Sequence, residues 1–260
     1  MPYYGISIEG SNEVNHGETI TVTGILGVTE ATYEGYTVDG DPIIKAGGKY
    51  YLLTDKGGVP PYVVTQQQQS YTLCFARGTL IATPSGDKAV EDLRIGDLVL
   101  TADGQAVPVK WIGRQTRHPL FTELPVRIRT GALGNGLPRR DLYVSPAHAL
   151  LVDGLLVQAQ ALVNGATIQQ MKEWQGNVEY FHIELENHEL VLAEGTPAET
   201  FVDNASRRTF DNFAEYLELY GEESPIPELP QPRVKHRRQL PARIQQRLMD
   251  IARSGYSQVA

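Results

Sequence analysis

The amino-acid sequence predicts an all-β protein with a helical tail, and three observations indicate this fold class. Short segments rich in Val, Ile, Leu, Thr and Tyr, each bounded by Gly, Pro, Asn or Asp, fill residues 1–64 and 74–203. Two of these segments recur, in the same order, about 70 residues further along the chain. Helical spacing of apolar residues begins only after Asp203.

Residues 1–66 are predicted to form a small β domain. The stretch "GETITVTGILGV" alternates Thr with apolar residues, and Asp-Gly and Gly-Gly breaks suggest hairpins. No cluster here suggests chemistry, and we interpret its tyrosines as sheet packing. The polar, uncharged stretch "TQQQQSYTL" then predicts a linker over residues 67–73.

Residues 74–203 are predicted to form a second, larger β domain. Within it "GTLIATPSG" (78–86) resembles "HALLVDG" (148–154), and "VEDLRIGDLV" (90–99) resembles "AQALVNGATI" (159–168). The second match sets Gly96 against Gly165. We interpret the echo as two similar halves, each burying a face against the other.

Residues 204–260 are predicted to form a helical tail with two helices separated by "ESPIPELPQPR". The apolar stripes that predict the helices are Phe210, Phe213, Tyr216 and Leu217 in the first, and Leu240, Ile244, Leu248 and Ile251 in the second. Arginines surround the second stripe. Such a basic helix either docks on its own domain or binds an acidic partner or membrane surface.

Composition excludes several classes of protein. The formal net charge of -8 argues against a general nucleic-acid binder. No run approaches the roughly 20 apolar residues of a membrane span, and the N-terminus lacks a signal-peptide pattern. We therefore expect synthesis in the cytoplasm without a cleaved signal, with secretion by a signal-less route left open.

The single cysteine, Cys74, lies where the linker meets the larger β domain. One Cys excludes an internal disulfide and a zinc site with several thiolates. A thiol at such a position can attack the carbonyl carbon of the preceding residue, Leu73, and move the acyl group from nitrogen to sulfur. Because an amide is more stable than a thioester, the protein must polarise the amide and protonate the departing amine.

Histidines are the natural acids for this step. His148 follows Ser145 by three residues around a proline, in a turn predicted to aim both side chains inward. His182 and His188 are evenly spaced, so a continuous strand would put both on one face. Three histidines and one Cys could also bind zinc, although the spacing lacks a tight ligand pair. We expect no metal and no cofactor.

Three blocks of sequence resemble the Hint domains shared by inteins and Hedgehog autoprocessing proteins. "CFARGTLIATPSGDKAVEDLRIGDLVLTADG" is similar to the opening block, "SPAH" to the Thr-x-x-His block, and "VEYFHIELENHELVLAEG" to the closing block. His188 falls on the histidine of the closing block, and His182 stands where inteins usually carry Asp or Cys. The resemblance implies a pseudo-twofold, horseshoe-like all-β fold over residues 74–203.

The chain departs from both families at one point each. Where inteins end in His-Asn it has Glu199 and Thr200 within "TPAETFVDN", so no Asn side chain is there to cyclise. Where Hedgehog domains carry an acceptor-activating Asp it has "VKWIGRQ", near Gly113. The resemblance is therefore to bacterial Hint proteins that neither splice nor transfer sterol.

By this resemblance, Cys74 is the nucleophile and Leu73 supplies the carbonyl. Ser145 and His148 would polarise the amide and protonate the leaving nitrogen, with His188 and His182 assisting. The reaction would be a single-turnover acyl shift at Leu73–Cys74, followed by hydrolysis or transfer of residues 1–73 to a small nucleophile. Two alternatives stay open: a degenerate Hint fold that serves as a structural or binding module in a secreted or surface-associated protein, and a plain β protein with a buried Cys.

Overall fold

The computed structural model of the 260-residue chain describes residues 73–119, 122–202 and 206–256, together with five strands nearer the N-terminus. Most of the predicted linker, residues 67–72, and the predicted boundary at Asp203 lie outside the described residues. The chain divides into two compact units, residues 1–69 with 120–122 and residues 70–119 with 123–260.

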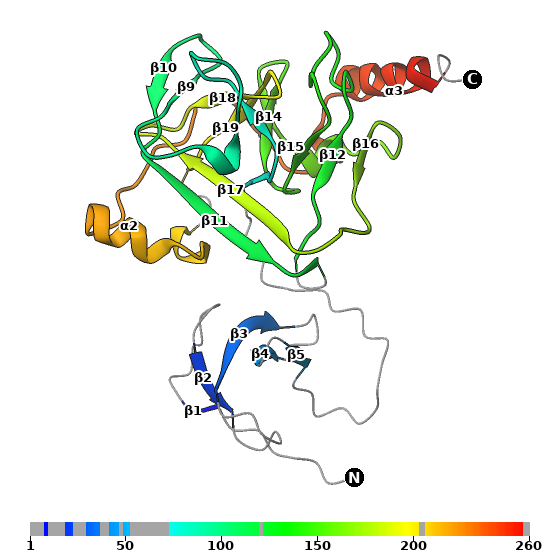
Figure 1. The fold of residues 1–260 in the computed structure, drawn as a ribbon. Coiled ribbons are helices and arrows are strands. Elements are labelled where there is room, and N and C mark those ends of the chain that lie inside the picture. Colours follow the sequence, from blue (N-terminus) through cyan, green and yellow to red (C-terminus); the bar gives the residue numbers. More distant parts are fainter. Residues whose placement is uncertain are drawn as a thin grey trace, which may run out of the picture. The chain divides into compact units, whose positions relative to one another are not determined.

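The N-terminal unit contains a five-stranded antiparallel sheet in which the strands pair in chain order (Figure 1). This arrangement confirms the small β unit predicted from the alternating Thr and apolar residues. A register shift between Tyr33 and Gly35 interrupts one pairing. The strands are β1 (Ile8–Glu9), β2 (Thr19–Val22), β3 (Glu30–Tyr36), β4 (Pro42–Ala46) and β5 (Lys49–Leu52).

The larger unit is built mainly from two sheets, which confirms the predicted all-β class. A six-stranded sheet runs in the order β11-β17-β6-β13-β12-β16, and a seven-stranded sheet in the order β20-β15-β14-β19-β18-β7-β8. The first contains β6 (Phe75–Ala76), β11 (Trp111–Arg117), β12 (Val126–Ile128), β13 (Leu142–Val144), β16 (Ile168–Gln170) and β17 (Val178–Glu184). The second contains β7 (Leu80–Ile81), β8 (Lys88–Ala89), β14 (Ala149–Val152), β15 (Leu155–Gln158), β18 (Leu190–Ala193), β19 (Thr196–Glu199) and β20 (Arg233–Val234).

The sequence echo corresponds to the two ends of the seven-stranded sheet. The β7-β8 hairpin leads into the helical turn η1 (Val90–Asp92), and the β14-β15 hairpin leads into α1 (Ala159–Leu162). The glycines that follow, Gly96 and Gly165, both have positive φ, 88° and 76°. Since β7 pairs with β18 and β14 with β19, while β18 and β19 pair with each other, the halves meet in the middle of the sheet. A separate hairpin joins β9 (Leu98–Leu100) to β10 (Ala106–Pro108).

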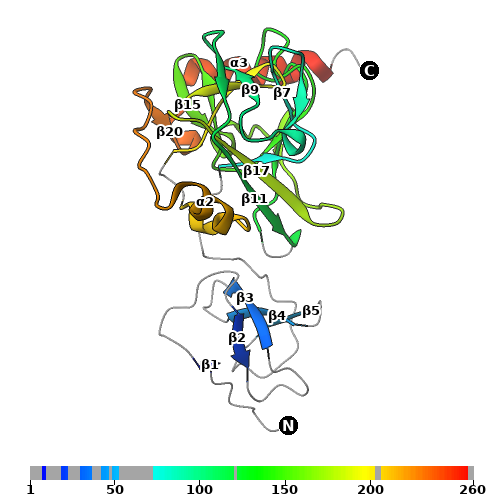
Figure 2. The ribbon, with the colours of Figure 1, turned by 60° about the vertical axis from the view of Figure 1, so that its left-hand side comes forward.

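The C-terminal tail packs into the same core as the sheets. It contains η3 (Arg207–Thr209), α2 (Phe213–Tyr220), η4 (Arg237–Gln239) and α3 (Ala242–Tyr256). Three residues of the predicted apolar stripe are confirmed as buried in the main apolar cluster, Ile244 and Leu248 of α3 and Leu240 just before the helix. The fourth, Ile251, is half-buried. In Figures 1 and 2, α2 lies beside β11. None of the helices among the described residues is both long and apolar enough for a membrane crossing.

The first tail helix differs from its prediction. Phe210 was expected on the helical stripe, but α2 begins at Phe213. Asn212, which precedes the helix, binds strand β11 through its side chain, and no continuous helix joins Phe210 to α2. Leu217, also expected on the stripe, is exposed. Of the four residues on the predicted stripe, Tyr216 is the one that lies within α2 and is fully buried.

Gly113, in the middle of β11, makes room for Phe210. A Cβ placed on Gly113 would lie 2.7 Å from the Phe210 ring, far inside van der Waals contact. The ring therefore rests directly on the strand backbone, and only glycine fits beneath it.

Replacing Gly113 with alanine should lower the free energy of unfolding by about 1–3 kcal/mol, because the added methyl overpacks against Phe210. Urea denaturation measures the loss. In a Phe210→Ala background the same substitution should be neutral or stabilising, since the ring is gone and alanine suits a strand better than glycine. An equal loss in both backgrounds would show that the Phe210 ring is not the cause.

Candidate active site

The pairing of three strands places the predicted nucleophile beside two of its predicted partners. Strand β6 lies between β17 and β13, with Phe75 opposite Phe181 on one side and Val144 on the other. Extending both registers by one residue brings Cys74 level with His182 and with Ser145. Neighbours in one row of an antiparallel sheet point to the same face, so side chains from distant parts of the chain converge.

Ser145 holds both sides of the Cys74 backbone. Its hydroxyl oxygen accepts a hydrogen bond from the Cys74 amide at 2.8 Å, and its own amide donates to the Cys74 carbonyl at 2.9 Å. The turn that follows is closed by the His148 amide, which donates to the Ser145 carbonyl at 3.0 Å. The amide nitrogen of the Leu73–Cys74 peptide is thus fixed in position, in a buried setting.

The Cys74 side chain is fully buried. Burial raises the pKa of its thiol well above the ordinary value, and the positive charge of Arg117 only partly offsets this. At neutral pH the group is therefore a thiol rather than a thiolate. A reaction at this sulfur needs a base to take its proton.

His148 is also fully buried, with its ring 4.3 Å from the ring of Phe75. Neither ring nitrogen has a hydrogen-bond partner among the residues that the structure describes. Burial lowers the pKa of His148 to about 4, opposed by the charge of Glu199 and by the backbone of Leu73. Because only an acceptor favours the protonated ring, the Leu73 group that raises the pKa of His148 is its carbonyl oxygen. This carbonyl lies near the imidazole but does not make a normal hydrogen bond to it.

His182 sits in the middle of β17, opposite Gly113 of β11. Its ring stacks on Phe210, with centroids 5.8 Å apart and planes 13° apart, and lies 6.2 Å from the ring of His148. Burial holds the pKa of His182 well below its usual value, and the neighbouring His148 lowers it further. The second imidazole of the site is thus uncharged at neutral pH.

His188 reaches the site by a different route from the one expected. The even spacing of 182 and 188 suggested one continuous strand, but β17 ends at Glu184 and His188 lies in the turn before β18. Its Nδ1 accepts the amide of Leu229 at 3.0 Å, and its Nε2 lies 3.5 Å from Glu199. A charged neighbour, rather than a shared strand face, links His188 to the other histidines.

Glu199 is the residue that sequence reasoning missed. It is completely buried at the end of β19, where it accepts the Ala149 amide at 2.7 Å and pairs with Arg233 at 2.7 Å. Burial opposes ionisation, but hydrogen bonds from His188 and Arg233, together with the Arg233 charge, outweigh it and lower the pKa of Glu199 to about 2. The side chain is therefore a fixed negative charge, and it raises the pKa values of His148 and His182. An acid in an otherwise apolar strand is the only sequence signal that could have indicated it.

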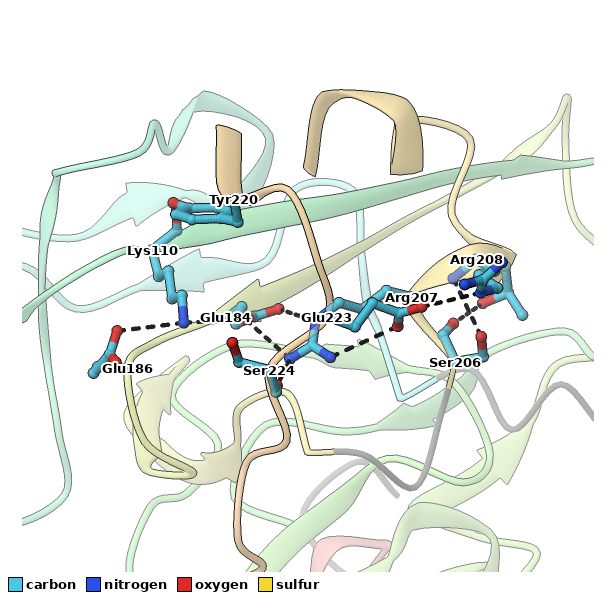
Figure 3. Close-up of polar contacts among 10 residues, drawn as sticks. Lys110, Glu184, Glu186, Ser206, Arg207, Arg208, Tyr220, Glu223 and Ser224 are labelled. Atoms are coloured by element: carbon cyan, nitrogen blue, oxygen red, sulfur yellow. Dashed lines mark hydrogen bonds and ion pairs between the residues drawn. The ribbon is translucent and has the colours of Figure 1, made fainter. Parts of the chain in front are cut away.

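A second buried charge pair lies beside the site. Arg207 donates to both carboxylate oxygens of Glu184, at 2.8 and 3.1 Å, and to the carbonyl of Ser224 (Figure 3). Its guanidinium lies 4.2 Å from the ring centre of Phe201 and 4.9 Å from that of Tyr216. Figure 3 also shows Lys110 between Glu184 and Glu186. Planar guanidinium stacking with a bidentate carboxylate fixes this tail residue against β17.

The arrangement is suited to moving a proton among buried groups. A thiol, two uncharged imidazoles and a serine hydroxyl surround one buried peptide bond. Within residues 73–119, 122–202 and 206–256, no three His, Cys, Asp or Glu side chains are grouped to hold a metal ion.

The chain was compared with curated proteins, with solved structures and with protein families. No curated protein matches the chain. An intein-like domain from Clostridium thermocellum is 15% identical, with a TM-score of 0.36, and covers 49% of this chain and 98% of its own. A DnaB intein from Synechocystis is 12% identical, with a TM-score of 0.35, and covers 50% of this chain and 99% of its own. The Hint domain family matches residues 73–205, just over half of the 260 residues. The chain therefore belongs to the Hint domain family.

Proposed function

We propose that this Hint domain processes its own chain at the Leu73–Cys74 peptide bond. The Cys74 sulfur attacks the Leu73 carbonyl carbon, the carbon–nitrogen bond breaks, and the acyl group moves to sulfur. The thiol proton ends on the Cys74 nitrogen, so the step is an isomerisation that needs no cofactor. It occurs once per chain, with residues 1–73 as the acyl group.

The observation that carries this proposal is the double hold of Ser145 on Cys74. The hydroxyl fixes the amide nitrogen at 2.8 Å and the Ser145 amide fixes the carbonyl of the same residue at 2.9 Å. Holding the reacting groups in a fixed orientation removes much of the entropic part of the barrier. A serine that served packing alone would not need to bind this one amide.

The protonation states favour a relay through His148. Burial keeps the Cys74 thiol and the His148 ring uncharged at neutral pH. The proton that reaches the leaving nitrogen is then the thiol's own, accepted by the imidazole and passed on. The charge of Glu199 stabilises the imidazolium that forms between the two transfers. His182 and His188 would support this charge distribution without touching the scissile bond.

The second step takes the acyl group from sulfur. Water or a small amine or thiol attacks the thioester carbon, the sulfur leaves as the Cys74 thiol, and residues 1–73 carry a new carboxylate, amide or thioester. Neither splicing nor sterol transfer fits these residues, because Thr200 occupies the place of the intein asparagine that would cyclise, and Gly113 leaves no acid for an acceptor alcohol.

One observation favours a second candidate function, a Hint fold that does not cleave. Burial raises the pKa of the Cys74 thiol and lowers that of the His148 imidazole, so at rest the nucleophile is protonated and its base is a weak one. A module in this state would serve as a structural or binding domain. Cleavage of the purified chain distinguishes the two candidates.

Incubating the purified chain at neutral pH should yield two fragments cut at Leu73–Cys74, and dithiothreitol or hydroxylamine should speed their appearance by attacking the thioester. Mass spectrometry identifies the cut. Cys74→Ala should abolish it. Fragments of the same masses from Cys74→Ala would show that another process cuts the chain, and an intact wild-type chain under both reagents would leave the non-cleaving function.

Replacing His148 with alanine should slow cleavage by about 100-fold or more, because the proton relay is lost. Ser145→Ala should slow it less, since only the placement of the amide changes. Quenched time courses measure both rates, with Thr130→Ala, at an exposed position, as the control. Equal rates for His148→Ala and wild type would remove the imidazole from the mechanism.

Acidification should destabilise the domain through His148. Because its pKa is about 4 in the folded state and 6.5 otherwise, the unfolded chain binds more protons between these values. The free energy of unfolding should fall by about 3 kcal/mol from this group as pH drops from about 6.5 to about 4. Urea denaturation across this range should show a smaller loss in His148→Asn. His236→Asn, at an exposed position, should match wild type; an unchanged slope in His148→Asn would contradict the assignment.

A further inference from the structure

The face of the six-stranded sheet that carries Cys74 is closed by the tail. Cys74, Ala76 and Tyr180 point from neighbouring strands into one apolar cluster. The other side of this cluster is made by Phe201, near the end of the β domain, and by the tail residues Phe210, Tyr216 and Ile226. The complete burial of the Cys74 side chain therefore depends on the tail as well as on the strands.

Phe210 is the tail residue nearest the reacting row. Its ring stacks on His182, which is level with Cys74, and rests on the backbone of Gly113. The contact with Gly113 is so close that even a Cβ would clash at 2.7 Å. No water layer separates the ring from the sheet at this point.

Residues 206–212, here called the cover segment, are attached to the exposed edge of β11. The Asn212 side chain accepts the Arg114 amide at 2.8 Å and donates to the Ile112 carbonyl at 2.9 Å. Asp211 accepts the Thr116 amide at 2.7 Å, and its own amide donates to the Arg114 carbonyl at 2.8 Å. These bonds pair backbone groups at the edge of β11 with polar groups of the cover segment. Such an attachment is specific, yet it can open without breaking the pairing between the strands of the sheet.

The opposite end of the cover segment is anchored by Arg207. Its guanidinium pairs with Glu184 at 2.8 Å and is held between the rings of Phe201 and Tyr216. Asp211 in addition binds Arg117, the one residue whose charge lowers the pKa of the Cys74 thiol. The cover segment thus contacts both the residues packed around Cys74 and a cation that acts on the Cys74 thiol.

We propose that the cover segment keeps bulk water away from Cys74, and that Phe210 determines which nucleophile receives the acyl group. The inference deepens the proposed function and rests on it for the acyl step. With Phe210 in place, water reaches the thioester carbon only while the segment is open, so the acyl group stays on sulfur long enough for another nucleophile to compete with water. Without the ring, water attacks the carbon, the sulfur leaves as a thiol, and residues 1–73 are released with a free carboxylate.

The first test measures access to Cys74 and does not depend on cleavage. Because the chain has one cysteine, a disulfide reagent such as 5,5′-dithiobis(2-nitrobenzoic acid) reports on this thiol alone. Phe210→Ala should raise the labelling rate of the folded chain at least about tenfold, which corresponds to about 1.4 kcal/mol in the opening equilibrium. Phe210→Leu, which keeps most of the volume, should label more slowly than Phe210→Ala. Leu219→Ala, on the exposed side of α2, should match wild type.

Circular dichroism establishes that each variant is folded. If Phe210→Ala unfolds, Asn212→Ala provides the same test, because it loosens the cover segment at a half-buried position and leaves the cavity lining intact. Labelling as slow as wild type in folded Phe210→Ala, or in Asn212→Ala when it is needed, would overturn the inference.

The second test measures the fate of the acyl group. In hydroxylamine, mass spectrometry separates residues 1–73 with a free carboxylate from the hydroxamate, and Phe210→Ala should raise the carboxylate share over wild type. An unchanged share would overturn the role of Phe210 in acceptor choice. If labelling rises in Phe210→Ala but neither this variant nor wild type cleaves, the role of the cover segment in shielding Cys74 is supported and the acyl shift of the proposed function is rejected.

Discussion

The position of strand β6 between β17 and β13 is the constraint on which the rest of the site depends. A two-residue strand contributes little pairing of its own, yet both neighbours fix its register, Phe75 being opposite Phe181 and Val144. A slip of one residue would turn Cys74 to the opposite face of the sheet and replace it with Leu73 or Phe75. The long β11–β17 pairing, seven residues on each strand, keeps that register rigid from one side.

Electrostatics divides the interior into a neutral centre and a charged rim. Around the scissile bond the titratable groups are uncharged at neutral pH, because burial raises the pKa of the Cys74 thiol and lowers those of His148 and His182. Beside it lie two buried carboxylates that are paired with arginines, Glu199 with Arg233 and Glu184 with Arg207. Each pair fixes its carboxylate by several hydrogen bonds, so the negative charge acts at a distance without moving. Such fixed charges favour the imidazolium more effectively than mobile solvent does.

Much of the fold could be predicted from the sequence, because its signals are local. Strand composition, turn residues and the internal echo predicted the two β units and the duplicated hairpins, and the apolar stripe predicted α3. The site was harder, since its parts meet through long-range pairing. The Ser145–His148 turn was visible as a short motif, whereas Glu199 acquires its role only because β20 pairs in parallel with β15 and brings Arg233 beside it.

The first tail helix shows why the remainder escaped prediction. The periodicity of Phe210 with Phe213 and Tyr216 is that of a helix, but Asn212 and Asp211 are hydrogen-bonded to the edge of β11 instead. Tertiary contacts overrode local propensity at that point. The same contacts explain why position 113 is glycine. In the sequence it marked the place where Hedgehog domains carry an Asp, whereas in the structure the Phe210 ring packs directly against its backbone.

The burial of Ile244 and Leu248 of α3 in the main apolar cluster has a consequence for the timing of events in the cell. The ribosome makes Cys74 long before it makes α3, so the early part of the domain emerges while its interior is still open to solvent on that side. Folding to the final packing must wait until α3 has left the exit tunnel. The acyl shift proposed at Leu73–Cys74 needs the finished interior, so it would be delayed until translation has passed this helix, and a nascent chain stalled before α3 would keep that peptide bond intact.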